Sequence, residues 1–143
     1  MKSLSIVILF LSFSFSVNAQ KQGISGKVFW LSANQMPGPG MNLTPQQGAP
    51  REILIYKVAT LQDVTKKGNF FSEIKTELVK KTYSDIEGSF KVKLAPGEYS
   101  VFVKEPQGLF ANSFDKDNKI NPIIVKSGKF SWITINIDYE AAY

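Results

Sequence analysis

The chain of 143 residues contains no cysteine and no histidine. Without cysteine there is neither a disulfide framework nor a thiolate nucleophile, so the apolar core alone must hold the fold together. Without histidine, Ser-His-Asp triads and histidine-ligated zinc sites are excluded. Carboxylate pairs and a serine or threonine with a lysine base remain as catalytic options, but no spacing in the sequence singles out such a group. We therefore expect a protein that is not an enzyme and needs no cofactor.

A large excess of charge is also lacking. The chain has 17 Lys and Arg residues and 12 Asp and Glu residues, for a formal net charge of +5. The basic residues are dispersed, with adjacent pairs only at Lys66-Lys67 and Lys80-Lys81. A nucleic-acid footprint would show basic residues clustered in a stripe with interleaved aromatics. We expect a soluble basic surface and no nucleic-acid partner.

Long apolar runs are scarce too, and the one present lies at the start of the chain. Lys2 precedes an apolar stretch from Leu4 to Val17, and Asn18-Ala19 follows with side chains that a signal peptidase accepts. The run is shorter than the roughly 20 residues of a membrane-spanning helix. We expect a signal peptide at 1–19 and a single exported domain at 20–143, periplasmic or extracellular, with no membrane span in the mature chain.

Alternating apolar and polar residues predict strands along most of the mature chain. In the first strand, Ile24, Val28 and Trp30 share one side, and in the last strand Trp132 lies opposite the isoleucine face. The second strand is apolar on both faces, which is typical of a central strand. Together these patterns predict an all-β protein, a seven-stranded antiparallel Greek-key β-sandwich. The expected strands are 23–31, 52–60, 76–84, 89–94, 99–104, 122–126 and 130–138.

Turn chemistry predicts how three pairs of strands are connected. Asp85 to Gly88 suits a type I turn, and Ala95 to Glu98 carries Pro-Gly at the centre of a type II turn. These two turns predict a β-meander over residues 84–101. A third turn, Ser127-Gly128-Lys129, predicts a closing hairpin between the last two strands.

Three segments resemble the carboxypeptidase regulatory-like domain. They are Gly26-Lys27-Val28, the run Thr82 to Phe90 with its Asp-x-x-Gly-x-Phe pattern, and the run Leu94 to Val101 with its Leu-x-Pro-Gly-x-Tyr pattern. The resemblance implies a transthyretin-like sandwich, related to carbohydrate-binding-like folds. It also implies an accessory domain without catalytic residues. No peptidase, receptor plug or barrel accompanies the domain in this chain, so a regulatory role does not transfer with the resemblance.

Three long segments, 32–51, 61–75 and 105–121, are the places where recognition is expected, because loops on a rigid sandwich usually carry it. The first contains four prolines and three glycines, and could equally be a simple connection. Its Met36 or Met41 could dock against a protein partner. In the second, residues 61–64 could form a helical turn, while Phe70 and Phe71 should pack in a core or a lid.

Two sets of side chains are candidate sites. Asp115 and Asp117 offer clustered oxygens for calcium, but Lys119 occupies the position of a third donor, so a solvated turn is the favoured interpretation. Aromatic residues could form a stacking platform for sugars, although filling the core is the expected role of most of them. The platform candidates are Trp30, Trp132, Phe110 and Phe114, with Tyr56, Phe70 and Phe71 as further aromatics.

Two functions remain open at this stage. The first is a non-catalytic exported binding or structural module of the cell envelope that binds a protein through its long loops. The alternative is a carbohydrate-binding domain that uses surface aromatics. Exposed, coplanar tryptophans would favour a glycan ligand, whereas a buried aromatic set and a bare apolar patch would favour a protein partner.

Overall fold

The computed structural model describes residues 21–34, 38–39 and 46–142. The predicted signal peptide lies outside the described residues, and so do residues 35–37 and 40–45 of the 32–51 segment, including Met36 and Met41. No helix among the described residues is long and apolar enough to cross a membrane.

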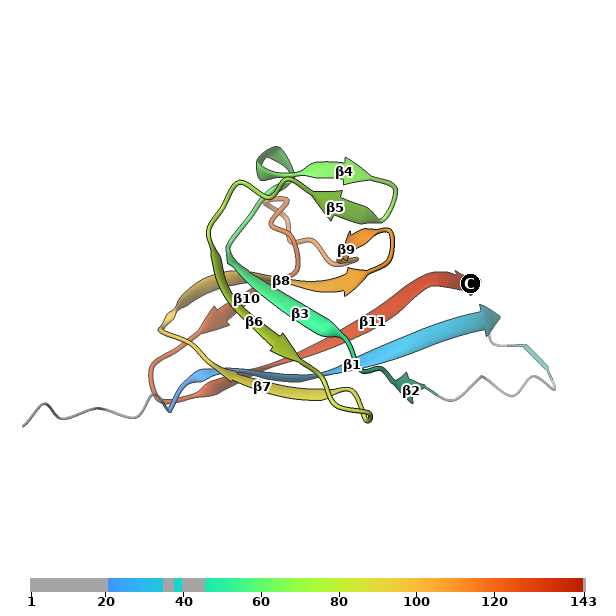
Figure 1. The fold of residues 1–143 in the computed structure, drawn as a ribbon, viewed down its shortest axis with the longest axis horizontal. Helices are drawn as coiled ribbons and strands as arrows, with labels where there is room; N and C mark the ends of the chain where they lie inside the picture. Colours follow the sequence, from blue (N-terminus) through green and yellow to red (C-terminus); the bar gives the residue numbers. More distant parts are fainter. Residues whose placement is uncertain (1–20, 35–37, 40–45, 143) are drawn as a thin grey trace, which may run out of the picture.

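The described residues form an all-β domain of two facing sheets (Figure 1). Its elements are β1 (Gly23–Asn34), β2 (Gln47–Gly48), β3 (Glu52–Lys57), the 3₁₀ turn η1 (Leu61–Asp63), β4 (Thr65–Lys67), β5 (Phe70–Ser72), β6 (Leu78–Tyr83), β7 (Ser89–Lys93), β8 (Gly97–Glu105), β9 (Gly108–Phe110), β10 (Pro122–Val125) and β11 (Phe130–Ala142). The seven predicted strands are all present. The short strands β2, β4, β5 and β9 arise within segments that the sequence analysis treats as loops.

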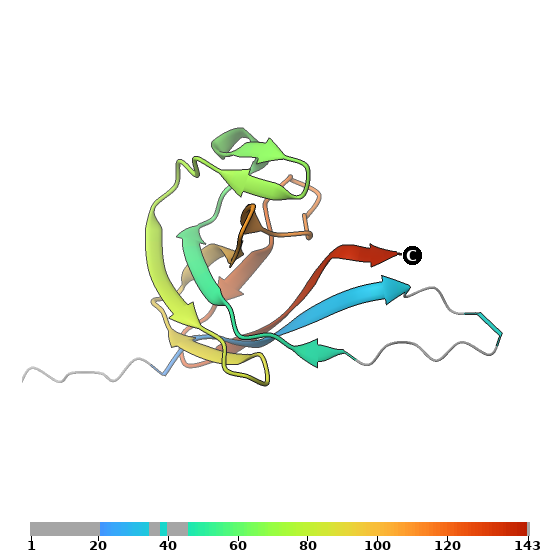
Figure 2. The ribbon, with the colours of Figure 1, turned by 45° about the vertical axis from the view of Figure 1, so that its right-hand side comes forward.

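The smaller sheet has β1 at its centre. One edge of β1 pairs with β11, and the other edge pairs with β7 and then with β2. The β1–β11 pair is parallel, and its register runs from Gly23 beside Phe130 to Asn34 beside Ala142. The prediction of an all-β, mostly antiparallel sandwich is confirmed, and this parallel pair is a departure from it. Figure 2 shows β1 and β11 running side by side to their shared end.

The larger sheet follows the order β4-β5-β9-β8-β3-β6, with β10 added beside β8. The prediction that β3 is central and apolar on both faces is confirmed, because it pairs with β6 and β8. Ile53 and Ile55 lie in the main core between the sheets, and Tyr56 packs on a second cluster on the opposite face. The second cluster is covered by the segments 61–75 and 109–120, so these segments serve the core.

The phenylalanines of β5 and β9 confirm the expected packing role of this region. Phe71 and Phe110 are each 1% exposed, and Phe70 packs against the main core. The helical turn expected at 61–64 is also present, as η1. Thr60 caps the N-terminus of this turn with a capping box. Its side chain accepts from the Gln62 amide, and the Asp63 carboxylate accepts from the Thr60 amide at 2.9 Å.

The Asp85–Gly88 turn forms as predicted, but it joins strands of different sheets. The Gly88 amide donates to the Asp85 carbonyl at 2.9 Å, and the Asp85 carboxylate accepts from the amides of Glu87 and Ser89. Yet β6 pairs with β3, β7 pairs with β1, and β8 returns to β3. The predicted meander at 84–101 is therefore wrong: the chain crosses the sandwich twice.

The closing hairpin is wrong for the same reason. β10 pairs with β8 in the larger sheet, whereas β11 pairs with β1 in the smaller one. The turn at 127–129 is present, with the Lys129 amide donating to the Lys126 carbonyl at 3.3 Å, but it crosses between sheets. The Ser131 hydroxyl then donates to the Ile124 carbonyl and links the edges of the two sheets.

Candidate functional site

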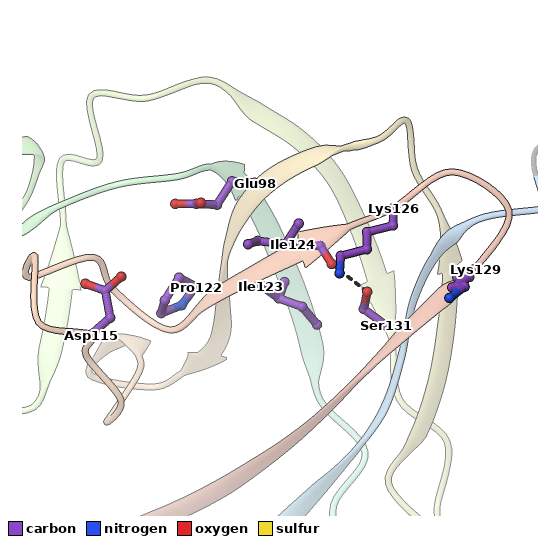
Figure 3. Close-up of a pocket in the computed structure, with 8 residues that line it drawn as sticks. All are labelled: Glu98, Asp115, Pro122, Ile123, Ile124, Lys126, Lys129 and Ser131. Carbon is purple, nitrogen blue, oxygen red and sulfur yellow. Dashed lines mark hydrogen bonds between the residues drawn. The ribbon is translucent and has the colours of Figure 1, made fainter.

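A groove of about 510 Å³ lies where the edges of the two sheets meet (Figure 3). β10 supplies its apolar floor, the 105–121 segment and the start of β8 supply one end, and the turn before β11 supplies the other. Ile124 is 55% exposed within it, whereas the neighbouring Ile123 points into the core. The lining residues are Glu98, Asp115, Pro122, Ile123, Ile124, Lys126, Lys129 and Ser131.

The two ends of the groove carry opposite charges. Figure 3 shows Glu98 and Asp115 at one end, and Lys126 and Lys129 toward the other. Glu98 also binds Lys119, whose Nζ lies 2.7 Å from Glu98 Oε1. That hydrogen bond is the main reason why the pKa of Lys119 lies above its usual value, and it outweighs the opposing effect of desolvation. The arrangement suits an extended ligand held by shape and charge.

Asp115 and Asp117 form a turn, as the favoured interpretation of the sequence has it. One carboxylate oxygen of Asp115 accepts from the Asp117 amide at 2.9 Å and from the Lys119 amide at 3.0 Å. That oxygen is committed to holding the backbone of the loop. Within the described part of the chain, no three acidic side chains gather as a metal site would require. The hydrogen bonds of Asp115 therefore fix the loop that forms one end of the groove.

The aromatic candidates do not meet on one surface. Phe110 is buried in the core, and Phe114 is 39% exposed, with its ring centroid 6.1 Å from that of Phe71. Trp30 is half-buried, and its ring meets that of Tyr139 edge to face at 5.4 Å. Trp132 is 62% exposed. Of these four candidates, Trp132 is the most exposed.

The two tryptophans lie on opposite faces of the smaller sheet. Trp30 pairs in register with Ile137, so it shares the inner face with the core residues of β11. Trp132 pairs with Ser25, one residue out of phase with Ile24, and therefore shares the outer face. A platform of two coplanar tryptophans is thus ruled out by the strand register.

Trp30 instead belongs to a polar and aromatic cluster beneath the end of β11. The Arg51 guanidinium lies 5.7 Å from the Trp30 ring centroid, and Arg51 Nε lies 2.9 Å from Glu105 Oε2. The Tyr139 hydroxyl donates to the other oxygen of Glu105 at 3.2 Å. Arg51, Glu105 and Tyr139 thus bind one another, and the Trp30 ring packs against Arg51 and Tyr139, so Trp30 serves the structure.

The outer face of the smaller sheet brings together residues that are far apart in the sequence. Lysines and aromatics lie there on three strands: Lys91 and Lys93 on β7, Lys27 and Phe29 on β1, and Phe130 and Trp132 on β11. The Lys91 ammonium lies 4.2 Å from the Phe130 ring centroid. The lysine face of β7 was apparent from alternation, but its neighbours depend on long-range pairing that no local pattern encodes.

No family model, characterised protein or solved structure matches the chain. The resemblance to the carboxypeptidase regulatory-like domain stays a prediction from the quoted motifs. The function must therefore be argued from the surfaces described above.

Proposed function

We propose that the protein is a non-catalytic, exported binding module of the cell envelope that holds an extended segment of a protein partner in the groove between its sheet edges. The exposed Ile124 carries this proposal, because a large apolar side chain stands in the middle of a groove with opposite charges at its ends. Such a surface combines an apolar contact with charge-based orientation, as peptide-binding grooves do.

The proposal identifies the chemistry of the partner. A segment with a basic residue at one end would face Glu98 and Asp115, and an acidic residue at the other end would face Lys126 and Lys129. An apolar residue between them would cover Ile124. Of the three long segments named from the sequence, 105–121 contributes directly, through Asp115.

A peptide array tests this proposal with the purified mature chain. Peptides with a basic–apolar–acidic pattern should bind, and peptides with the charges reversed should bind less well. Ile124→Glu should weaken binding about tenfold or more, which corresponds to about 1.4 kcal/mol. Ile86→Glu is the matched control, because Ile86 is 83% exposed on the turn between β6 and β7. Equal binding by the two variants would remove the groove from the function.

A carbohydrate-binding domain is the second candidate, and exposed Trp132 favours it. Its indole Nε1 donates to Thr134 Oγ1 at 3.1 Å, which fixes the ring along the outer face of the sheet. A ring held in this way can stack on the C–H face of a sugar without losing much freedom on binding. Soluble glycans should then quench tryptophan fluorescence in the native chain and not in Trp132→Phe. An unchanged signal across a glycan panel would remove this second function.

A further inference from the structure

On the outer face of the smaller sheet, the lysines of β7 and the aromatics of β11 flank the small residues Gly23 and Ser25 of β1; we call this strip the trough, with a lysine wall and an aromatic wall. Ser25 of β1 pairs with Lys91 on one side and with Trp132 on the other, so these three residues form one row across the sheet. Gly23 likewise pairs with Lys93 and with Phe130 in the next row. Neighbouring strands lie about 4.8 Å apart, so the walls stand roughly 10 Å from each other.

The floor of the trough is open because its residues are small. Gly23 has no side chain and Ser25 has a short one, whereas both walls carry long side chains. The Lys91 ammonium bends across the floor to the Phe130 ring, 4.2 Å from its centroid. An anion could draw this flexible side chain away, because an exposed cation–π contact is weak.

The charge on this face has one sign near the trough. Lys27, Lys91 and Lys93 take part in none of the ion pairs found among the described residues. The carboxylate of β11 nearest to the trough on the outer face is that of Asp138, which lies three rows beyond Trp132 and binds Asn112 at 3.0 Å. The face therefore presents lysine charges without a neighbouring acid to neutralise them.

We propose that this trough binds an acidic polysaccharide. A sugar ring would stack on Trp132, and its carboxylate or sulfate would meet Lys91 and Lys93 across the floor. Lysine suits this role as a mobile point charge that follows anions along a chain. The inference rests on the second proposed function and specifies its ligand class; it is independent of the groove, which opens at the edge of the sandwich.

Titration calorimetry of the mature chain against four soluble ligands tests the inference. They are a uronic-acid polysaccharide, a neutral glucan, polyglutamate, and vesicles that contain an anionic phospholipid. We expect the uronic-acid chain to bind at least tenfold more tightly than the other three. Binding should weaken at high salt, because screening shortens the reach of exposed charges.

Paired variants assign the binding to the trough. Lys91→Gln/Lys93→Gln and Trp132→Ala should each weaken binding at least fivefold. Lys80→Gln/Lys81→Gln, which removes the same charge from β6, and Tyr83→Ala, which removes a 69% exposed aromatic ring, should leave binding unchanged. Circular dichroism and thermal melts confirm that every variant is folded.

Each other outcome contradicts a distinct claim. Equal affinity for the neutral glucan would refute the acidic class while leaving carbohydrate binding intact. Equal affinity for polyglutamate or for the vesicles would show that charge alone drives binding and would overturn the proposal. Absence of binding to both glycans would refute the trough and the carbohydrate function together. Loss of binding in the Lys80/Lys81 control would move the site to the larger sheet.

Discussion

Arg51 Nε lies 2.9 Å from Glu105 Oε2, and the Glu105 side chain is only 2% exposed. The pair joins the start of β3 to the end of β8, and Tyr139 brings β11 to the same carboxylate. Both sheets thus meet at a single buried charge.

Arg51→Met should destabilise the fold by about 3 kcal/mol, because it leaves a buried carboxylate without its cation. Lys104→Met is the control, since Lys104 lies 3.6 Å from Glu52 on the surface and should cost under about 1 kcal/mol. Urea unfolding measures both. The double variant Arg51→Met/Glu105→Met should recover most of the loss. A cost for Arg51→Met no larger than that for Lys104→Met would contradict the importance of this pair.

Gly88→Ala should be far more damaging than Gly68→Ala. Both glycines have positive φ, +83° and +62°, so alanine costs about 1 kcal/mol at either position. A Cβ at Gly88 would also stand 2.0 Å from the Val28 carbonyl oxygen, while a Cβ at Gly68 meets nothing within 4 Å. Thermal melts should therefore rank the two variants clearly. Similar melting temperatures would show that the turn accommodates the methyl group without loss of stability.

Stability should fall above pH 10. Burial raises the pKa of Tyr56 and Tyr99 above 10.0, and burial followed by the Glu105 charge does so for Tyr139. A raised pKa in the folded state means that the unfolded chain loses its proton first, so stability is complete below pH 10 and declines as pH rises through the folded-state pKa. Tyr56→Phe should flatten the slope of unfolding free energy above pH 10. An identical slope in wild type and variant would refute this.

Ser131→Ala should loosen the contact between the sheet edges. Its hydroxyl donates to the Ile124 carbonyl, and the loss of such a bond costs about 1 kcal/mol. Hydrogen exchange of the β10 amides should accelerate, because β10 is a short edge strand held on one side by β8. Ser127→Ala, on the neighbouring turn, serves as the control. Unchanged exchange in Ser131→Ala would show that β8 alone fixes β10.

Local structure was predictable from the sequence to a large extent. The alternation of Phe90, Val92 and Leu94 identified the buried face of β7, and the carboxylate of Asp85 closes its turn as its position suggested. These features depend on neighbours within a few residues. Turn chemistry says where the chain reverses, but not which strand then accepts its hydrogen bonds. The predictions of the meander and of the closing hairpin were wrong for this reason.

The candidate site was less predictable, because it depends on register between distant strands. The sequence places Trp132 opposite the isoleucine face, and only its pairing with Ser25 puts it in one row with Lys91 across the sheet. Phe110 and Phe114 lie in a segment whose apolar residues could be read as a patch or as core. Phe110 packs in the main core, and the Phe114 ring lies against Phe71 of the second cluster; no local pattern reveals these contacts.

The parallel pairing of β1 and β11 has a consequence for the order of folding. Gly23 and Phe130 are neighbours in the sheet, although almost the whole domain separates them along the chain. Contacts of such long range slow folding, because much chain must be ordered before they form. The edge of β1 that faces β11 therefore stays unpaired until the last strand is synthesised, although its other edge can already pair with β7, and a ribosome that still holds β11 would keep the smaller sheet incomplete.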